Sequence, residues 1–278
     1  MTISDRDQLV NAIANNNSRF FIDKASIANA VAGTVYSKWR ATGTPGQGAI
    51  PTTTAVCNNT TTGSIGFTQQ TSPATSYMSW LYAQTANALM TLEFHDRLAH
   101  MGGLNGTLTT AQTVDLDLNV LTADNIVTRR GDTNFSDVTW WMEWYTDTGA
   151  TASNATINVT YNDGTSGNLT VVPVGGTVRA SRAIQLNGLI PAADSGKFIR
   201  DINTVTLSAS TGTAGNFGFT ASRHRTSAPT IIANKAEVFD WAQLGLPEIH
   251  NSSCLMIYAW CVTTTTGLIR SQGKISHG

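Results

Sequence analysis

The run from Glu93 to His100 is the part of the sequence whose residue types could most readily do chemistry. It contains two of the five histidines and two carboxylates, the groups used in metal sites and in general acid–base catalysis. The surrounding pattern predicts a helix, on which His95 and His100 differ in direction by about 140°. Because two helical histidines that share a metal ion lie three or four residues apart, we expect no metal site here. We expect instead an ion pair between Glu93 and Arg97 on the helix surface.

Other catalytic motifs are absent from the sequence, which has no Gly-x-Ser-x-Gly elbow, no His-Glu-x-x-His motif and no EF-hand loop. The glycine-rich segments 43–48 and 188–197 lack the spacing of a phosphate-binding loop and are expected to be turns. We therefore predict no catalytic residue, no metal and no cofactor, and expect the chain not to be an enzyme. A hydrolase built on His95, Asp96 and His100 is the least favoured alternative.

Two smaller groups of residues have simple structural explanations. Asp115 and Asp117 would share one face of a strand, where we expect a solvent-exposed edge or an intersubunit contact. Cys57, Cys254 and Cys261 are odd in number and contain no Cys-x-x-Cys pair, so we expect three buried free thiols rather than disulfides.

Aromatic side chains are concentrated on one predicted strand, which carries Trp140, Trp141, Trp144 and Tyr145. Rings of this kind can stack on sugars, so a glycan-binding face is one explanation. Large rings on both faces of a strand are more typical of a core or a subunit interface, which we favour.

The basic side chains form two short clusters, Arg129–Arg130 and Arg223–His224–Arg225. Each is too small to follow a nucleic-acid backbone, but either could bind carboxylates of a neighbouring chain. The residues that we consider as interface candidates are therefore Trp140, Trp141, Trp144, Tyr145, Arg129, Arg130, Arg223 and Arg225.

The first hundred residues predict short helices and loops. A helix should begin at Ser4 and end at Asn15–Asn17, and a second helix should cover 24–32. The Thr-, Gly-, Pro- and Ser-rich stretch 41–76 predicts an extended, wrapping loop. The longest helix is expected over 77–100, packed on a sheet or on a partner subunit.

The rest of the chain alternates with the period of a β-strand. Strands are predicted at 138–145, 177–186, 203–210, 216–222 and 254–262, with a hairpin over 156–173 that turns at Asn162-Asp163-Gly164. A short helix is expected at 235–244. The predicted fold is mainly β, an antiparallel, jelly-roll-like β-sandwich with an N-terminal helical and loop arm and one longer helix. The expected organisation is an arm (1–75), a helix and connector (76–106), a β-sandwich body (107–262) and a polar tail (263–278).

Composition narrows the class of protein. The chain has 278 residues, a net charge of −1, 42 threonines and 21 asparagines, and only 13% of its residues are charged, against roughly 25% in an average domain. With 41% hydrophobic residues it is not a disordered chain. A near-neutral charge argues against nucleic-acid binding. We expect no signal peptide, no membrane segment and synthesis in the cytosol.

Several segments together resemble the structural proteins of tailed-bacteriophage virions. They are Asp96-Arg-Leu-Ala-His-Met-Gly-Gly-Leu-Asn-Gly-Thr107, Thr110-Ala-Gln-Thr113, Gly212-Thr-Ala-Gly-Asn-Phe-Gly218, Asp5-Arg-Asp-Gln-Leu9, Ile22-Asp-Lys-Ala-Ser26 and Trp39-Arg-Ala-Thr-Gly43. The resemblance spans most of the chain and implies a place in a particle rather than a reaction, so no functional residue is carried over.

The function implied is that of a capsid decoration, cement or minor capsid subunit, located in the virion and made in the bacterial cytoplasm. Its expected partners are itself, as a homo-oligomer such as a trimer, and the major capsid protein or other virion proteins. The N-terminal arm would clamp neighbouring subunits. The alternative is a tail-associated receptor- or glycan-binding module that uses the aromatic strand.

Overall fold

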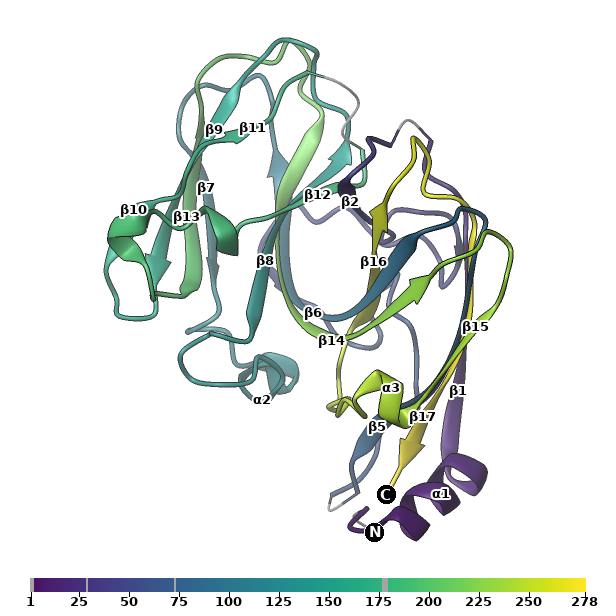
Figure 1. Ribbon diagram of the computed structural model, residues 1–278. Helices are drawn as coiled ribbons and strands as arrows, with labels where there is room; N and C mark the ends of the chain where they lie inside the picture. Colours follow the sequence, from purple (N-terminus) through teal and green to yellow (C-terminus); the bar gives the residue numbers. More distant parts are fainter. Residues whose placement is uncertain (1–2, 29, 73, 177–179) are drawn as a thin grey trace. The chain divides into compact units, whose positions relative to one another are not determined.

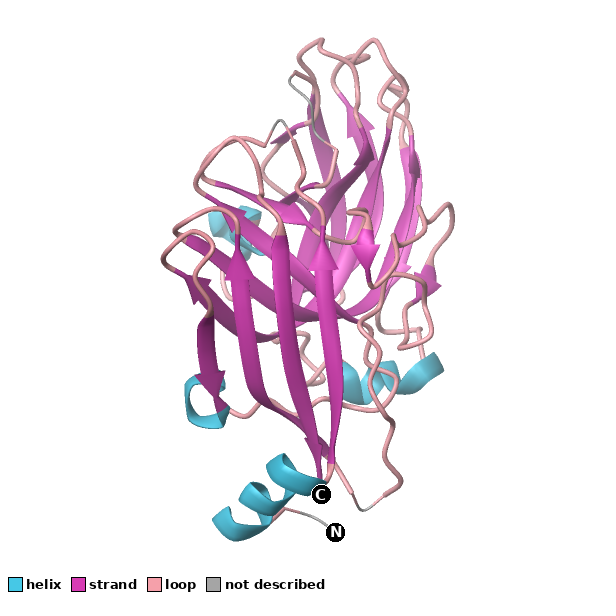
Figure 2. Cartoon of the chain, turned by 90° about the vertical axis from the view of Figure 1, so that its right-hand side faces the viewer, coloured by secondary structure: helices cyan, strands magenta, loops and turns pink. Residues whose placement is uncertain are grey.

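The computed structural model describes residues 3–28, 30–72, 74–176 and 180–278. These residues form antiparallel strands with few and short helices (Figure 2), which confirms the prediction of a mainly β fold. The chain divides into two compact units. Unit 1 comprises Met1–Ala49, Asn58–Asp96 and His224–Gly278, and unit 2 comprises Ile50–Cys57 and Arg97–Arg223.

The first sheet of unit 1 has five strands in the order β15-β5-β17-β1-β3. These strands are β15 (Glu237–Asp240), β5 (Ser76–Thr85), β17 (Ile269–His277), β1 (Asn17–Lys24) and β3 (Gly43–Thr44). Figure 1 labels β15, β5, β17 and β1. β17 pairs antiparallel with β1 on one side and with β5 on the other.

A second group of strands completes unit 1. In it β16 (Leu255–Cys261) pairs with β2 (Thr34–Ser37) and with the beginning of β6 (Met90–Leu104). Side chains from both groups, such as Leu81, Phe94, Ile257 and Ile275, share one core. The helices of this unit are α1 (Arg6–Asn15) and α3 (Trp241–Leu244).

Unit 2 also contains two groups of strands. One has the order β10-β9-β13-β7, with β11 also paired to β9, and in the other β8 pairs with β14 and β12. The strands are β7 (Gln112–Asp117), β8 (Val138–Thr146), β9 (Asn154–Tyr161), β10 (Ser166–Asn168), β11 (Val172–Pro173), β12 (Arg182–Gln185), β13 (Ile199–Leu207) and β14 (Asn216–Thr230), and β4 (Ala55–Val56) pairs with the later part of β6. Short helical turns are α2 (Ile126–Arg129), η1 (Ala123–Asn125), η2 (Asn187–Leu189) and η3 (Ala192–Asp194).

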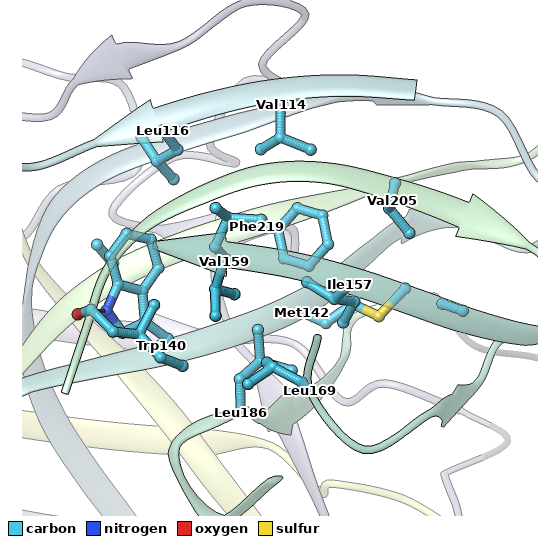
Figure 3. Close-up of a cluster of buried hydrophobic side chains, with 14 of the residues drawn as sticks. Val114, Leu116, Trp140, Met142, Ile157, Val159, Leu169, Leu186, Val205 and Phe219 are labelled. Carbon is cyan, nitrogen blue, oxygen red and sulfur yellow. Dashed lines mark hydrogen bonds between the residues drawn. The ribbon is translucent and has the colours of Figure 1, made fainter. Parts of the chain in front are cut away.

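The core of unit 2 is a single cluster of buried side chains. Figure 3 shows Trp140, Met142 and Phe219 from the β8 group together with Val159 and Val205 from the β9 group. Packing of side chains from two antiparallel sheets is the usual arrangement of a β-sandwich.

The N-terminal helix is confirmed, but its cap lies one residue later than predicted. The side chain of Asp5 accepts the Gln8 backbone N–H at 2.8 Å, whereas Ser4 donates to the Gln8 side chain. Leu9 and Ala12 form the buried face.

The two other helices predicted in the first hundred residues are wrong. Residues 77–100 belong to the strands β5 and β6, because Met90, Leu92 and Phe94 are buried alternately with more exposed neighbours, which is a period of two. Lys24 is the last residue of β1, and the described residues among 25–32 form a loop. In the described part of 41–76, the strands that precede β5 are two residues long, as expected of an extended loop.

The chain after residue 230 also departs from the prediction. Residues 235–244 form β15 and only one turn of helix, which Asp240 caps by accepting from two backbone N–H groups. Residues 263–278, expected to be a polar tail, contain the central strand β17. Gly273 allows β17 to pair with β1 at this central position, because the ring of Phe20 on β1 occupies the space that a side chain at residue 273 would fill.

The remaining strand predictions are confirmed with shifted ends. The aromatic strand is β8, the hairpin is β9 and β10 with Gly164 at a φ of 86°, and the last predicted strand is β16. β13 begins four residues earlier than expected, and β14 continues eight residues further. Of the predicted strand 177–186 only Arg182–Gln185 forms a strand, and residues 177–179 lie outside the described part.

Two lysines are buried among backbone carbonyls in unit 1. Lys38 donates to the Ala25 carbonyl at 2.7 Å and to Thr266 Oγ1 at 2.9 Å, and Lys24 donates to the carbonyls of Ala41 and Pro45. Burial lowers the pKa of Lys38 to about 7 and that of Lys24 to about 8. The ammonium form of Lys38 is disfavoured in this environment.

The free energy of unfolding should therefore rise as the pH increases from 7 to 9. In this range the unfolded chain keeps the proton on Lys38, whose pKa there is near 10.5, while the folded chain releases it. Each pH unit can add up to about 1.4 kcal/mol from one such group. Urea unfolding of the wild type and of Lys38→Met at pH 7, 8 and 9 checks this, and the difference between them isolates Lys38. Parallel pH profiles would contradict the assignment.

Candidate functional site

The aromatic residues predicted as interface candidates lie inside unit 2. Trp140, Trp141, Trp144 and Tyr145 are at most 4% exposed. The indole N–H of Trp140 donates to the Ile199 carbonyl at 2.7 Å, and that of Trp141 donates to Ser222 Oγ at 2.9 Å. The explanation that these rings form a core is confirmed, and none of them offers a face to a sugar or a partner.

The predicted arginine clusters are also bound within the chain. Arg129 is fully buried and donates to the carbonyls of Cys57 and Arg97, at 2.7 and 3.0 Å. Arg130 donates to the Leu118 carbonyl and lies over the ring of Phe135. These two guanidinium groups hold loops in place rather than extend to a neighbouring chain.

The two other arginines make similar internal contacts. Arg223 pairs with Asp137 at 2.7 Å and donates to the Arg129 carbonyl. Arg225 donates to the backbone carbonyl of Glu248.

The run from Glu93 to His100 lies in a strand rather than a helix, and within it Glu93 contacts His95 while Arg97 Nε donates to His100 Nδ1 at 3.0 Å. Asp96 accepts from Ser253 Oγ and from the backbone N–H of Cys254, both at 2.8 Å. Arg97 pairs with Glu143 at 2.7 Å, so the predicted Glu93–Arg97 ion pair is wrong. Among the described residues, no group of three or more His, Cys, Asp or Glu side chains could hold a metal ion.

The smaller predictions from the sequence agree with the structure. The carboxylates of Asp115 and Asp117 belong to β7, which is the edge strand of its sheet. None of the three cysteines forms a disulfide, and all three are buried.

The polar residues at the start of β6 form a site that the helical interpretation concealed. In the antiparallel register Thr91 lies opposite Trp260, and Glu93 lies opposite Tyr258. Directly opposite residues of paired strands share one face of the sheet, and diagonal neighbours remain within reach of long side chains. Thr91, Glu93, Tyr258 and Trp260 therefore share one face, while Leu92 and Phe94 enter the core on the other.

Glu93 is the centre of a hydrogen-bonded group on this face. Its carboxylate lies 3.2 Å from His95 Nε2 and also accepts from the side chain of Trp260. The ring of His95 packs edge-on against Tyr258 and His224, with centroids 5.0 and 5.2 Å away. Burial alone would raise the pKa of Glu93, but the hydrogen bonds from His95 and Trp260 keep it below its ordinary value. Burial lowers the pKa of His95, so at neutral pH the pair is a carboxylate beside a neutral imidazole.

A pocket of about 280 Å³ opens beside this carboxylate. It is lined by Gly33, Leu89, Thr91, Glu93, Trp260, Cys261 and Val262. The apolar members of its edge are unusually exposed, namely Leu89 at 62%, Val262 at 46% and Trp260 at 39%. The backbone carbonyl of Ile231 accepts a hydrogen bond from the backbone N–H of Leu89 at 3.3 Å, and the side chain of Ile231 is also exposed. We name Leu89, Ile231, Trp260 and Val262 the apolar rim.

The alternation of Met90, Leu92 and Phe94 with Thr91, Glu93 and His95 was the sequence signal for this face. Trp260 had no such signal, because its place beside Glu93 depends on the pairing of β6 with a strand far along the chain.

Comparisons with known proteins give a weak result. No protein-family model and no curated protein matches the chain. Among solved structures, T=1 particles derived from infectious bursal virus match at 10% identity and a TM-score of 0.19, over 94% of this chain and 77% of that one. The structure of infectious bursal disease virus Gt strain matches at 10% identity and a TM-score of 0.18, over 94% and 80%. A subviral particle of VP2 from the same virus matches at 10% and 0.17, over 94% and 79%.

These weak structural neighbours are viral particle proteins, and TM-scores of this size establish neither a shared fold nor a shared function. In the described part of the chain, no helix has the length and apolar character to cross a membrane.

Proposed function

We propose that the chain is a structural subunit of a virus particle, of the decoration, cement or minor capsid kind in a tailed phage. It would bind copies of itself and other virion proteins through the apolar rim of unit 1. The observation that carries this proposal is the exposure of three large apolar side chains, Leu89, Trp260 and Val262, that line one pocket.

An exposed cluster of this kind is typical of a docking surface. Single exposed hydrophobic residues are ordinary, but contiguous ones bordered by polar groups mark sites of association. Tryptophan is enriched among the residues that dominate binding energy at interfaces. The low charge of the chain, −1 in 278 residues, supports the same role, because many copies can then crowd together with little repulsion.

The rim replaces the N-terminal arm as the proposed contact. Residues 1–40 include β1 and β2, each of which pairs with strands of unit 1. Deleting them would therefore remove part of the fold rather than a detachable clamp. The tail-module alternative loses its motivating residues, because the rings assigned to it are buried.

The rim variant Leu89→Asp/Val262→Asp should lower the incorporation of the chain into particles at least about tenfold. Both side chains are exposed, so the stability of the chain should change by less than about 0.5 kcal/mol each. Burying one such side chain at an interface contributes about 1.5–3 kcal/mol, and 1.4 kcal/mol corresponds to a factor of ten. The matched control is Val120→Asp, which alters a side chain 67% exposed in unit 2.

Incorporation is measured by immunogold electron microscopy and by immunoblots of purified phage particles made with each variant. Label over the head that is lost only in the rim variant supports the proposal. Label at the tail tip would overturn the capsid position, normal incorporation of the rim variant would overturn the role of the rim, and unlabelled particles would overturn a virion function.

A further inference from the structure

The pocket enclosed by the apolar rim has a charged floor. The Glu93 side chain is 20% exposed and lines the pocket. A carboxylate offers about four acceptor positions, and His95 and Trp260 supply two donors. Acceptor capacity therefore remains on this carboxylate, which lines the pocket.

Neutralisation of this carboxylate by its neighbours is incomplete. His95 is 1% exposed, and burial disfavours its imidazolium form. The ring of His224 contacts that of His95, and its pKa is also lowered, because burial and the charge of Arg225 outweigh the opposite effect of Glu93. If a second protein covered this surface, burying the carboxylate without a positively charged partner would cost free energy.

Trp260 provides the wall beside the floor. Its side chain hydrogen-bonds to Glu93, and 39% of the residue stays exposed at the pocket. An indole ring next to an ionised carboxylate matches one chemical group well. A guanidinium is planar, donates two parallel hydrogen bonds to a carboxylate and stacks on an indole face.

We propose that this pocket binds the guanidinium of an arginine side chain presented by a partner protein, with Glu93 as its ion pair and Trp260 as its stacking surface. The aliphatic part of that arginine would contact Leu89 and Val262. The partner's place in a virion rests on the proposed function, but binding of the group itself does not and can be measured without particles.

The test uses the full chain labelled with 5-fluorotryptophan and followed by ¹⁹F NMR. The resonance of Trp260 is identified by its absence in Trp260→Phe. The probe is N-acetyl-arginine amide, and the control probe is N-acetyl-citrulline amide, which has nearly the same shape without the charge. We expect a saturable shift of the Trp260 resonance with the arginine probe and a shift at least about tenfold smaller with citrulline at equal concentration.

The matched variant is Glu93→Gln, which preserves the size of the side chain. Unchanged positions of the other tryptophan resonances show that it is folded, and its affinity for the arginine probe should fall at least about tenfold. The proposal is overturned by an absent shift, by an equal shift with the citrulline probe, or by unchanged binding in Glu93→Gln. If the chain binds the arginine probe but immunogold finds it on no particle, only the proposed function is overturned. If the chain is found on particles but does not bind the arginine probe, only this inference is overturned.

Discussion

Replacing Glu143 with leucine should lower the free energy of unfolding by about 3–5 kcal/mol. Glu143 and Arg97 are 1% and 0% exposed and pair at 2.7 Å. Thr220 also donates to Glu143, and Tyr145 contacts both charged groups. Removing one ion of a buried pair leaves the other without compensation, which costs this amount in comparable cases.

The measurement is urea unfolding of Glu143→Leu beside Asp137→Asn. Asp137 pairs with Arg223 at the same distance, but its side chain is 47% exposed, so its loss should cost less than about 1 kcal/mol. The double variant Arg97→Met/Glu143→Leu should recover most of the lost stability, because no unpaired charge remains. Equal effects of Glu143→Leu and Asp137→Asn would contradict the assignment of a buried ion pair.

Trp140→Ala should cost about 3–5 kcal/mol, the range found when large aromatic core residues are truncated. The ring is fully buried in the core of unit 2 (Figure 3), and its N–H donates to the Ile199 carbonyl. Truncation creates a cavity and also leaves that carbonyl without its indole donor. Trp140→Phe, which retains most of the volume, should cost less.

The control for this prediction is Trp260→Ala, which truncates the same type of side chain at the apolar rim. Thermal or urea unfolding should show a small change for Trp260→Ala and a large one for Trp140→Ala, whereas particle incorporation of the folded proteins should show the reverse order. A stability loss at Trp260 as large as that at Trp140 would mean that Trp260 belongs to the core.

The sequence predicted those elements whose pattern is local. The β9–β10 hairpin was recognisable because apolar and polar residues alternate along β9 and Asn162-Asp163-Gly164 is a typical turn. β8 was recognisable because its aromatic residues favour a strand. The region 77–100 was not recognisable as strands, because much of β6 is buried on both faces. Residues such as Leu98 and Ala99 therefore show no alternation of buried and exposed positions. Spacing alone then resembles that of a helix.

The candidate site could not be predicted from the sequence for the same reason, because its contacts are not encoded in a local pattern. Its residues were visible as residue types, but Glu93 and His95 share a face only if the segment is a strand. Their contact with Trp260 is set by the register of β6 and β16, which no local pattern encodes. The burial of Arg129 is likewise determined by carbonyls of Cys57 and Arg97, which come from other parts of the chain.

The position of β17 has a consequence for synthesis of the protein. Its two neighbours, β1 and β5, are translated long before it, and the interval between Asn17 and its partner Ser276 spans most of the chain. At about 5–20 residues per second the ribosome needs roughly 10–50 s to cover that interval. During this time two hydrophobic strands have unpaired edges, which favours chaperone binding or aggregation over folding. The sheet of unit 1 is therefore completed only late in translation or after it, and expression at a lower growth temperature should raise the folded yield.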